Sequence, residues 1–213
     1  MNKNLKPLTR SSYLCEVRAE QDDNGAYISG RPIVYDSRTN IGPYDEIIHV
    51  GALDKANLND VRFLVNHDLS KIPLARSRKN SKINTMLLET DRAGMAIRVN
   101  LDIENNAEAR SLYSAVQRGD ISGMSFMFGI DGEEWENLES EHPTRHIRSI
   151  STVIEVSAVT FPAYEDTEIY ARSTEALESA RHALENARSE EQPSVETDEL
   201  KLYKLKNNIL GGF

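Results

Sequence analysis

Ser125 is the residue whose surroundings point most directly to chemistry. It lies in the apolar run of residues 123–129 (GMSFMFG), just after a helical pattern that ends near residues 118–120. A serine hydroxyl is a weak nucleophile unless a base takes its proton and a third group orients that base. Ser125 is therefore either a packed strand residue or a nucleophile. The rest of the sequence must supply a histidine and a carboxylate.

His67 is the leading candidate for the base. It follows the β-branched and aromatic run of residues 61–65 (VRFLV), so it stands where a predicted strand ends, between Asn66 and Asp68. Imidazole gains and loses a proton near neutral pH, which suits a proton shuttle. A histidine in a surface loop fits the same local sequence, and the residues alone favour that simpler interpretation.

Glu155 is the candidate for the orienting group. It lies inside the apolar segment of residues 153–160 (VIEVSAVT). A carboxylate in such a segment is costly to bury unless it is paired or hydrogen-bonded, so its presence calls for a partner. Strand alternation equally allows Glu155 to lie on the solvent side of an edge strand, and the residues do not decide between the two.

The sequence favours no cofactor or metal. It contains no helical His-x-x-x-His pair, no glycine-rich phosphate loop and no dinucleotide fingerprint. Cys15 is the single cysteine, and we expect it to be a buried strand residue. The other histidines are expected to face solvent, with His146 the hardest to dismiss. They are His49, His142, His146 and His182.

The composition limits the partners and the compartment. Asp and Glu outnumber Lys and Arg by 34 to 25, for a formal net charge of −9 over 213 residues. This balance argues against a nucleic-acid-binding surface, which needs clustered cations. No apolar run approaches a membrane span, and the N-terminal residues lack the apolar stretch of a signal peptide. We therefore expect a soluble, intracellular protein without nucleic-acid or membrane partners, and a single cysteine fits a reducing compartment.

Strands dominate the predicted core, with turn-forming residues 22–25 (DDNG) joining the first two in a hairpin. The expected strands cover residues 13–19, 26–35, 44–50, 61–65, 72–75, 84–90, 95–101, 123–129 and about 146–161. One convincing helix begins at Asn105 or Asn106 and ends at Gly119, and residues 51–58 are expected to form two helical turns. An acidic loop is expected around residues 132–134. The fold class is therefore α+β, with a β-rich, antiparallel, barrel-like core and peripheral helices.

The chain is expected to have three parts. Residues 1–11 form a flexible N-terminal arm, residues 12–172 the core domain, and residues 173–213 a charged tail, partly helical and partly disordered. The tail helix, residues 174–188, carries a narrow apolar stripe that needs a partner. The stripe consists of Leu177, Ala180, Leu184 and Ala187.

Several short motifs occur together in a fixed order. They are YDEII (44–48), GAL (51–53), NHD (66–68), DRAGM (91–95), GDISGMSF (119–126), EVS (155–157) and FPA (161–163). Each motif is weak alone, but the ordered set resembles the prohead maturation proteases of tailed bacteriophages, which are related to the herpesvirus assemblins. The resemblance covers about residues 12–172 and implies an assemblin-like core. It leaves the tail unexplained.

The resemblance implies a serine endopeptidase that acts inside the phage procapsid in the host cytoplasm. Its substrate would be the scaffolding segment of the major capsid protein, and members of this family often cleave themselves as well. Self-association of the protein is compatible with the resemblance but is not implied by it. By family match, His67 is the general base, Ser125 the nucleophile and Glu155 the acidic third member, where the assemblins use a second histidine. Backbone amides near Ser125, or Arg148, would stabilise the oxyanion. The alternative is a non-catalytic capsid assembly or scaffolding protein that keeps the protease-like core.

Overall fold

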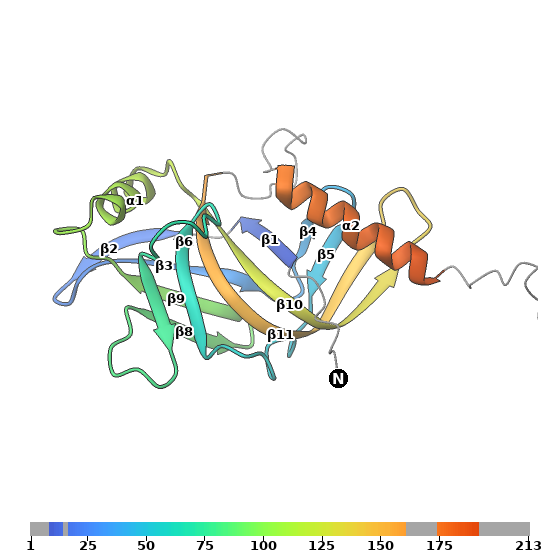
Figure 1. Ribbon diagram of the computed structural model, residues 1–213, viewed down its shortest axis with the longest axis horizontal. Helices are drawn as coiled ribbons and strands as arrows, with labels where there is room; N and C mark the ends of the chain where they lie inside the picture. The colour runs from blue at the N-terminus through green and yellow to red at the C-terminus, as the bar shows by residue number, and fades with distance from the viewer. Residues whose placement is uncertain (1–8, 15–16, 161–173, 192–213) are drawn as a thin grey trace, which may run out of the picture.

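The computed structural model describes residues 9–14, 17–160 and 174–191 (Figure 1). Cys15, the FPA motif, the first eight residues of the predicted arm and the chain beyond residue 191 lie outside the described residues. None of the helices in the described part is long and apolar enough to cross a membrane.

The larger sheet has seven strands, and β11 is its central member. Its strands are β1 (Thr9–Leu14), β4 (Arg38–Asn40), β5 (Asp45–Ile48), β6 (Asp60–Val65), β7 (Ala75–Arg78), β10 (Gly123–Glu136) and β11 (Thr144–Val159). One edge of β11 pairs antiparallel with β10, which in turn pairs with β1. The other edge pairs parallel with β5 near the start of β11 and with β6 near its end. This arrangement buries the end of β11 between β10 and β6.

The smaller sheet has four strands in the order β2-β3-β9-β8. They are β2 (Arg18–Asp22), β3 (Gly25–Val34), β8 (Met86–Asp91) and β9 (Gly94–Asn100). The predicted hairpin forms as β2 and β3, and β3 shifts register between Gly30 and Ile33, where Pro32 removes a backbone donor. The described strands form two open sheets, so the α+β class with a β-rich core is confirmed while barrel-like closure is not shown. The expectation of a purely antiparallel core is wrong for the larger sheet, which is mixed because β5 and β6 pair parallel with β11.

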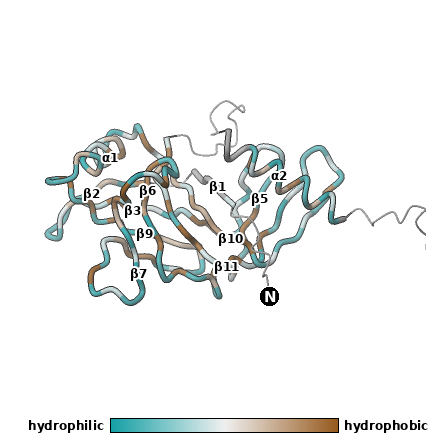
Figure 2. Tube along the Cα trace, viewed as in Figure 1, coloured by the Kyte–Doolittle hydropathy of each residue, from teal (hydrophilic) through white to brown (hydrophobic). Residues whose placement is uncertain are grey.

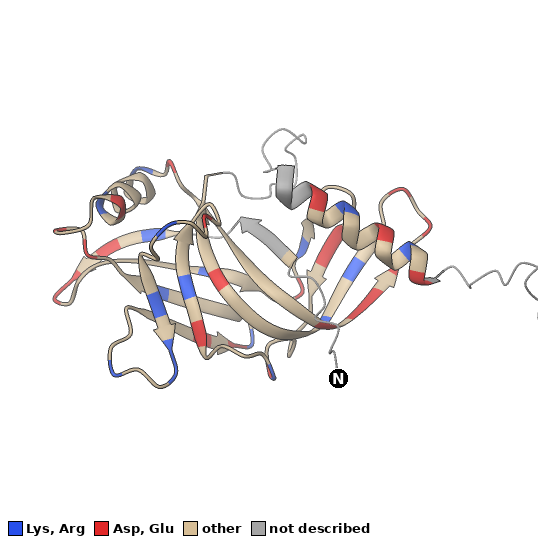
Figure 3. Ribbon diagram, in the orientation of Figure 1, with Lys and Arg blue, Asp and Glu red and all other residues tan. Residues whose placement is uncertain are grey.

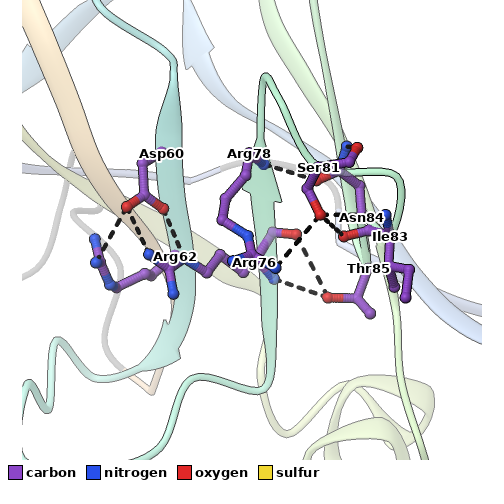
Figure 4. A network of polar contacts seen from close by, with 8 residues as sticks. All are labelled: Asp60, Arg62, Arg76, Arg78, Ser81, Ile83, Asn84 and Thr85. Atoms are coloured by element: carbon purple, nitrogen blue, oxygen red, sulfur yellow. Dashed lines mark hydrogen bonds and ion pairs between the residues drawn. The ribbon is translucent and has the colours of Figure 1, made fainter.

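Polar contacts join the two sheets between β7 and β8. Thr85, just before β8, donates its N–H to the carbonyl of Arg76 at 3.1 Å and accepts the Arg76 N–H on its hydroxyl at 2.9 Å. The Arg76 guanidinium reaches the other way, to Asp60 on β6, with two bonds of 2.6 Å (Figure 4). These hydrogen bonds from Arg76 hold the pKa of Asp60 below its ordinary value. The start of β6 is thereby fixed at the end opposite His67.

One apolar cluster connects both sheets and α1. It includes Ile28 and Ile33 of β3, Phe63 of β6, and Phe126 of β10, all fully buried. Hydrophobic stretches along these strands are visible in Figure 2. Burial of such side chains contributes roughly 1.5–3 kcal/mol each, so this cluster is the main source of rigidity behind the strands that carry the candidate site.

The predicted core helix forms as α1 (Ala107–Arg118), and residues 119–122 connect it to β10. The Asn106 side chain accepts the N–H groups of residues 108 and 109, as an N-cap should. Gly119 ends the helix in the left-handed conformation with φ +79°. Ala109, Leu112 and Val116 are buried, so the predicted apolar face packs on the core.

The second helix, α2 (Thr174–Glu191), packs against strands and loops far away in the sequence. Ala180 and Leu184 are buried with Ile41, Tyr44 and Leu138. Figure 1 shows α1 and α2 at opposite ends of the molecule. Ala180, Leu184 and Ala187 of the apolar stripe thus have their partner within the same chain, while the side chain of Leu177 lies outside the described residues. The boundary of the tail at residue 173 stays a prediction.

Several local predictions were wrong. The strand expected at residues 72–75 lies instead at Ala75–Arg78 as β7, and the strand expected at residues 13–19 is divided between β1 and β2. Residues 51–58 form successive tight turns, with bonds such as Ala52 N–H to His49 O and Asp54 N–H to Gly51 O, and no α-helix. Residues 132–134 are not a loop, because β10 continues to Glu136 and stays paired with β11. Glu133 contacts Arg145, and Glu134 contacts Arg148, across this pair. Figure 3 shows basic residues on β11 and acidic residues on β10 at this end of the pair. Cross-strand ion pairs let charged residues continue a strand that composition alone would end.

Gly94, at the start of β9, is expected to tolerate no side chain. Its φ is +135°, and a Cβ would lie 1.9 Å from the carbonyl oxygen of Ile33. Gly94→Ala should lower the free energy of unfolding by the strain of that backbone conformation, roughly 1–3 kcal/mol, and by a further cost of about 1–3 kcal/mol for the clash. Urea denaturation followed by circular dichroism measures the loss.

Gly25→Ala is the matched control, since Gly25 has φ +108° at the β2–β3 turn but nothing within 4 Å of the place that a Cβ would take. It should show the strain alone. Equal destabilisation of the two variants would contradict the close approach of β3 and β9 at Gly94.

Candidate active site

The structure brings Ser125, His67 and Glu155 together in one hydrogen-bonded chain. Ser125 Oγ lies 2.6 Å from His67 Nε2, and His67 Nδ1 lies 2.5 Å from Glu155 Oε1. The residues are 58 (125−67) and 30 (155−125) positions apart, so only the fold brings them into contact. β11 carries Glu155 between β10, which carries Ser125, and β6, which His67 follows.

His67 is held by an unusual backbone turn at the end of β6. Asn66 and His67 have φ values of +52° and +59°, a left-handed conformation that costs roughly 1–3 kcal/mol per non-glycine residue. Side-chain bonds offset this cost. Asn66 Oδ1 accepts the N–H of Thr160 at 2.9 Å, and the His67 N–H donates to Ser157 Oγ at 3.1 Å. The ring is therefore aimed at β10 by contacts with the last residues of β11 and the residue that follows it.

Glu155 is fully buried, and both of its carboxylate oxygens have partners. Oε1 faces the imidazole, while Oε2 accepts a 2.6 Å hydrogen bond from the Ser157 hydroxyl. The alternative of a glutamate on the solvent side of an edge strand is wrong, because β11 is paired on both edges at this point. Burial without bulk water strengthens the attraction between this carboxylate and a protonated imidazole.

Ser157 belongs to the site although the sequence predicted no role for it. Its hydroxyl donates to Glu155 and accepts from the His67 backbone, so one side chain holds both Glu155 and His67 in place. The residue is fully buried. The spacing in the sequence could have indicated this role. Residues two apart on a strand face the same side, so Ser157 shares a face with Glu155.

The hydrogen-bond directions follow from what each group can donate. A carboxylate only accepts, so His67 Nδ1 carries the proton that faces Glu155. Nε2 is then free to accept from the Ser125 hydroxyl. Ser125 is fully buried and the His67 side chain is 11% exposed, which leaves the imidazole at the boundary between core and solvent. The arrangement can move a proton from the serine to the imidazole.

Arg148 is not an oxyanion donor, which corrects that expectation. Its guanidinium pairs with Glu134 at 3.0 Å. It lies seven residues (155−148) before Glu155 on β11, roughly 20 Å along the strand. The backbone amides near Ser125 stay a prediction for this role.

The remaining histidines lie away from the site. His146 Nδ1 is 2.9 Å from His49 Nε2, and the pair is flanked by Asp36 and Glu136. Both rings are half-buried against each other, so the expectation that these two histidines face solvent was wrong. Burial lowers the pKa of His49, and the nearby Arg148 lowers it further. Nine residues (155−146) separate His146 from Glu155, close to 30 Å along β11. Within the described ranges, no group of three or more His, Cys, Asp or Glu side chains is arranged to hold a metal ion.

Comparison with known proteins gives one result. Residues 14–181 match the family model described as caudovirus prohead serine protease. The match spans well over half of the chain, includes Ser125, His67 and Glu155, and reaches into α2. Neither a curated protein nor a solved structure matches the chain significantly.

Proposed function

The chain belongs to the caudovirus prohead serine protease family, and from this premise we propose that it is an endopeptidase of capsid maturation with Ser125 as nucleophile, His67 as general base and Glu155 as the acid that orients His67. The hydrogen-bond chain from Ser125 through His67 to Glu155 supports this proposal most directly. The substrate is the scaffolding segment of the capsid protein, and the protease itself is a second substrate. Both are cleaved inside the procapsid in the host cell.

The mechanism follows from the proton positions. Ser125 Oγ attacks the scissile carbonyl carbon while His67 Nε2 takes the hydroxyl proton, which gives a tetrahedral oxyanion and an imidazolium. The intermediate collapses as His67 donates that proton to the leaving amine, and the acyl group stays on Ser125. A water molecule then attacks the ester, again with His67 as base, and releases the carboxylic acid product and free Ser125.

Glu155 and Ser157 support this cycle without touching the substrate. The Glu155 carboxylate keeps the Nδ1 proton in place and stabilises the imidazolium that forms in each half of the reaction. Ser157 occupies the second carboxylate oxygen, which leaves only Oε1 to face the imidazole. The same hydroxyl holds the His67 backbone, so the base keeps its position when it gains charge.

Labelling with diisopropyl fluorophosphate tests the proposal without a known substrate. In the reaction, Ser125 Oγ bonds to phosphorus, fluoride leaves, and His67 takes the proton. The wild-type chain should gain one diisopropylphosphoryl group on Ser125, mapped by peptide mass spectrometry. Ser125→Ala and His67→Ala should not be labelled on the same timescale, because one lacks the nucleophile and the other the base.

Urea-unfolded wild-type protein is the control, since unfolding separates the three residues and should abolish labelling. A folded wild-type chain that remains unlabelled at Ser125 would contradict the protease. That result would favour the non-catalytic assembly or scaffolding protein.

A further inference from the structure

A groove of about 520 Å³ lies between α1 and the loop that joins β6 to β7. Its lining is mainly aliphatic, with Leu64 and Leu74 on the sheet side and Leu112 and Ile121 on the helix side. Ile72 also lines the groove, and it is 83% exposed. An aliphatic side chain so open to water at the edge of an apolar groove gains from any apolar group that covers it.

The groove lies next to the turn that carries His67, although the His67 side chain itself does not line it. Asn66 and Asp68, the neighbours of His67 on both sides, line it. Ile121 lies four residues before Ser125, in the segment that connects α1 to β10. At the rim, Lys71 of the loop pairs with Glu108 of α1 at 2.8 Å, which ties the two walls together. A ligand in this groove would therefore lie against the residues that flank His67 in the chain, between two walls that this exposed ion pair links.

We infer that this groove is a specificity pocket that takes a large apolar side chain of the substrate, such as Leu, Ile, Met or Phe, next to the scissile bond. The inference rests on the proposed endopeptidase function. A peptide held for attack by Ser125 must pass beside His67, and the side chains nearest the bond then meet this groove. Its volume lies within the range of pockets that bind small ligands. Most of its lining is aliphatic, and two of its three charged residues, Lys71 and Glu108, are paired with each other.

Filling the groove from α1 tests the assignment. Ser111 is exposed and lines the groove, so Ser111→Trp should occupy the space without disturbing the core. Gln117→Trp is the matched control, because Gln117 is exposed on the same helix and is not among the residues that line the groove. The purified full-length proteins are given a mixed library of synthetic peptides, and the cleaved bonds are identified by mass spectrometry.

The wild type and Gln117→Trp should cleave next to a large apolar residue at one fixed position. Ser111→Trp should shift the preference at that position toward Ala or Gly, with the ratio of kcat/KM values changed at least about tenfold, as expected when a side chain no longer fits. Labelling of Ser125 by diisopropyl fluorophosphate, which carries no peptide, should be equal in all three. Ile72→Ser is a second variant at the exposed rim, and it should weaken the same preference without affecting labelling.

Two other outcomes separate failure of the pocket from failure of the protease. If all variants cleave the library with one unchanged preference, the groove does not bind substrate, and a second copy of the chain or an assembly partner remains as its occupant. If the folded wild type is neither labelled nor active, the proposed function fails, and the specificity pocket fails with it.

Discussion

Co-expression of the Ser125→Ala chain with its capsid subunit should leave the subunit at full length, whereas the wild-type chain should shorten it. The substitution removes the only atom that can form the acyl intermediate while His67 and Glu155 stay in contact. Loss of the nucleophile in a well-studied serine protease costs on the order of 10⁶ in kcat. At that rate no cleavage should be visible during co-expression. Denaturing gels and intact mass spectrometry of both proteins detect the shortening.

Ser151→Ala is the control for this experiment, because Ser151 is an exposed serine on β11 that is not part of the contact between Ser125, His67 and Glu155. It should process the subunit as the wild type does. Circular dichroism should show that Ser125→Ala is folded, since a methyl group fits a site that already excludes water. Shortened subunit with identical ends in the Ser125→Ala sample would remove Ser125 from the mechanism, and full-length subunit in every sample would favour the scaffold.

The identity of the catalytic residues could be predicted from motifs, but their contacts could not. For His67 and Glu155, the local sequence fitted a solvent-facing residue equally well or better. Which strand lies beside which is a non-local property, and the parallel pairing of β6 with β11 joins segments 93 residues apart (155−62). Once β11 is known to be central, the apolar residues around Glu155 are explained by burial on both faces.

Elements with strong local signals were predicted correctly, and the errors arose where tertiary contacts dominate. Asn106 and Gly119 carry the capping chemistry that defines α1, and both act as expected. The acidic Glu133 and Glu134 suggested a false loop, because their cationic partners lie across the hairpin on β11. Likewise, the stripe on α2 predicted that a partner exists. Nothing local identifies that partner as Tyr44 and Leu138.

Glu155→Gln should lower kcat by about 10⁴ while leaving KM nearly unchanged, as amide replacement of the acid does in a Ser-His-Asp triad. The amide keeps the volume of the carboxylate, so the buried site stays filled. Its NH₂ group can face His67 Nδ1 and donate to it, which would move the imidazole proton to Nε2. That proton would then point at Ser125, and the base could no longer accept from the hydroxyl. Steady-state hydrolysis of a peptide selected from the library measures the loss.

Two further variants separate the role of the Glu155 charge from that of its surroundings. Glu134→Gln makes the same chemical change on an exposed residue paired with Arg148, far from the catalytic chain, and should leave kcat unchanged. Ser157→Ala keeps the carboxylate but removes one hydrogen bond from it and one from the His67 backbone, so a loss of about tenfold is expected, the equivalent of one modest hydrogen bond. The loss of kcat should therefore increase from Glu134→Gln through Ser157→Ala to Glu155→Gln. This order is expected if Glu155 orients His67 and the buried Ser157 supports Glu155. A Glu155→Gln variant within tenfold of the wild type would show that His67 keeps its productive tautomer without the carboxylate, and would remove Glu155 from the proposed triad.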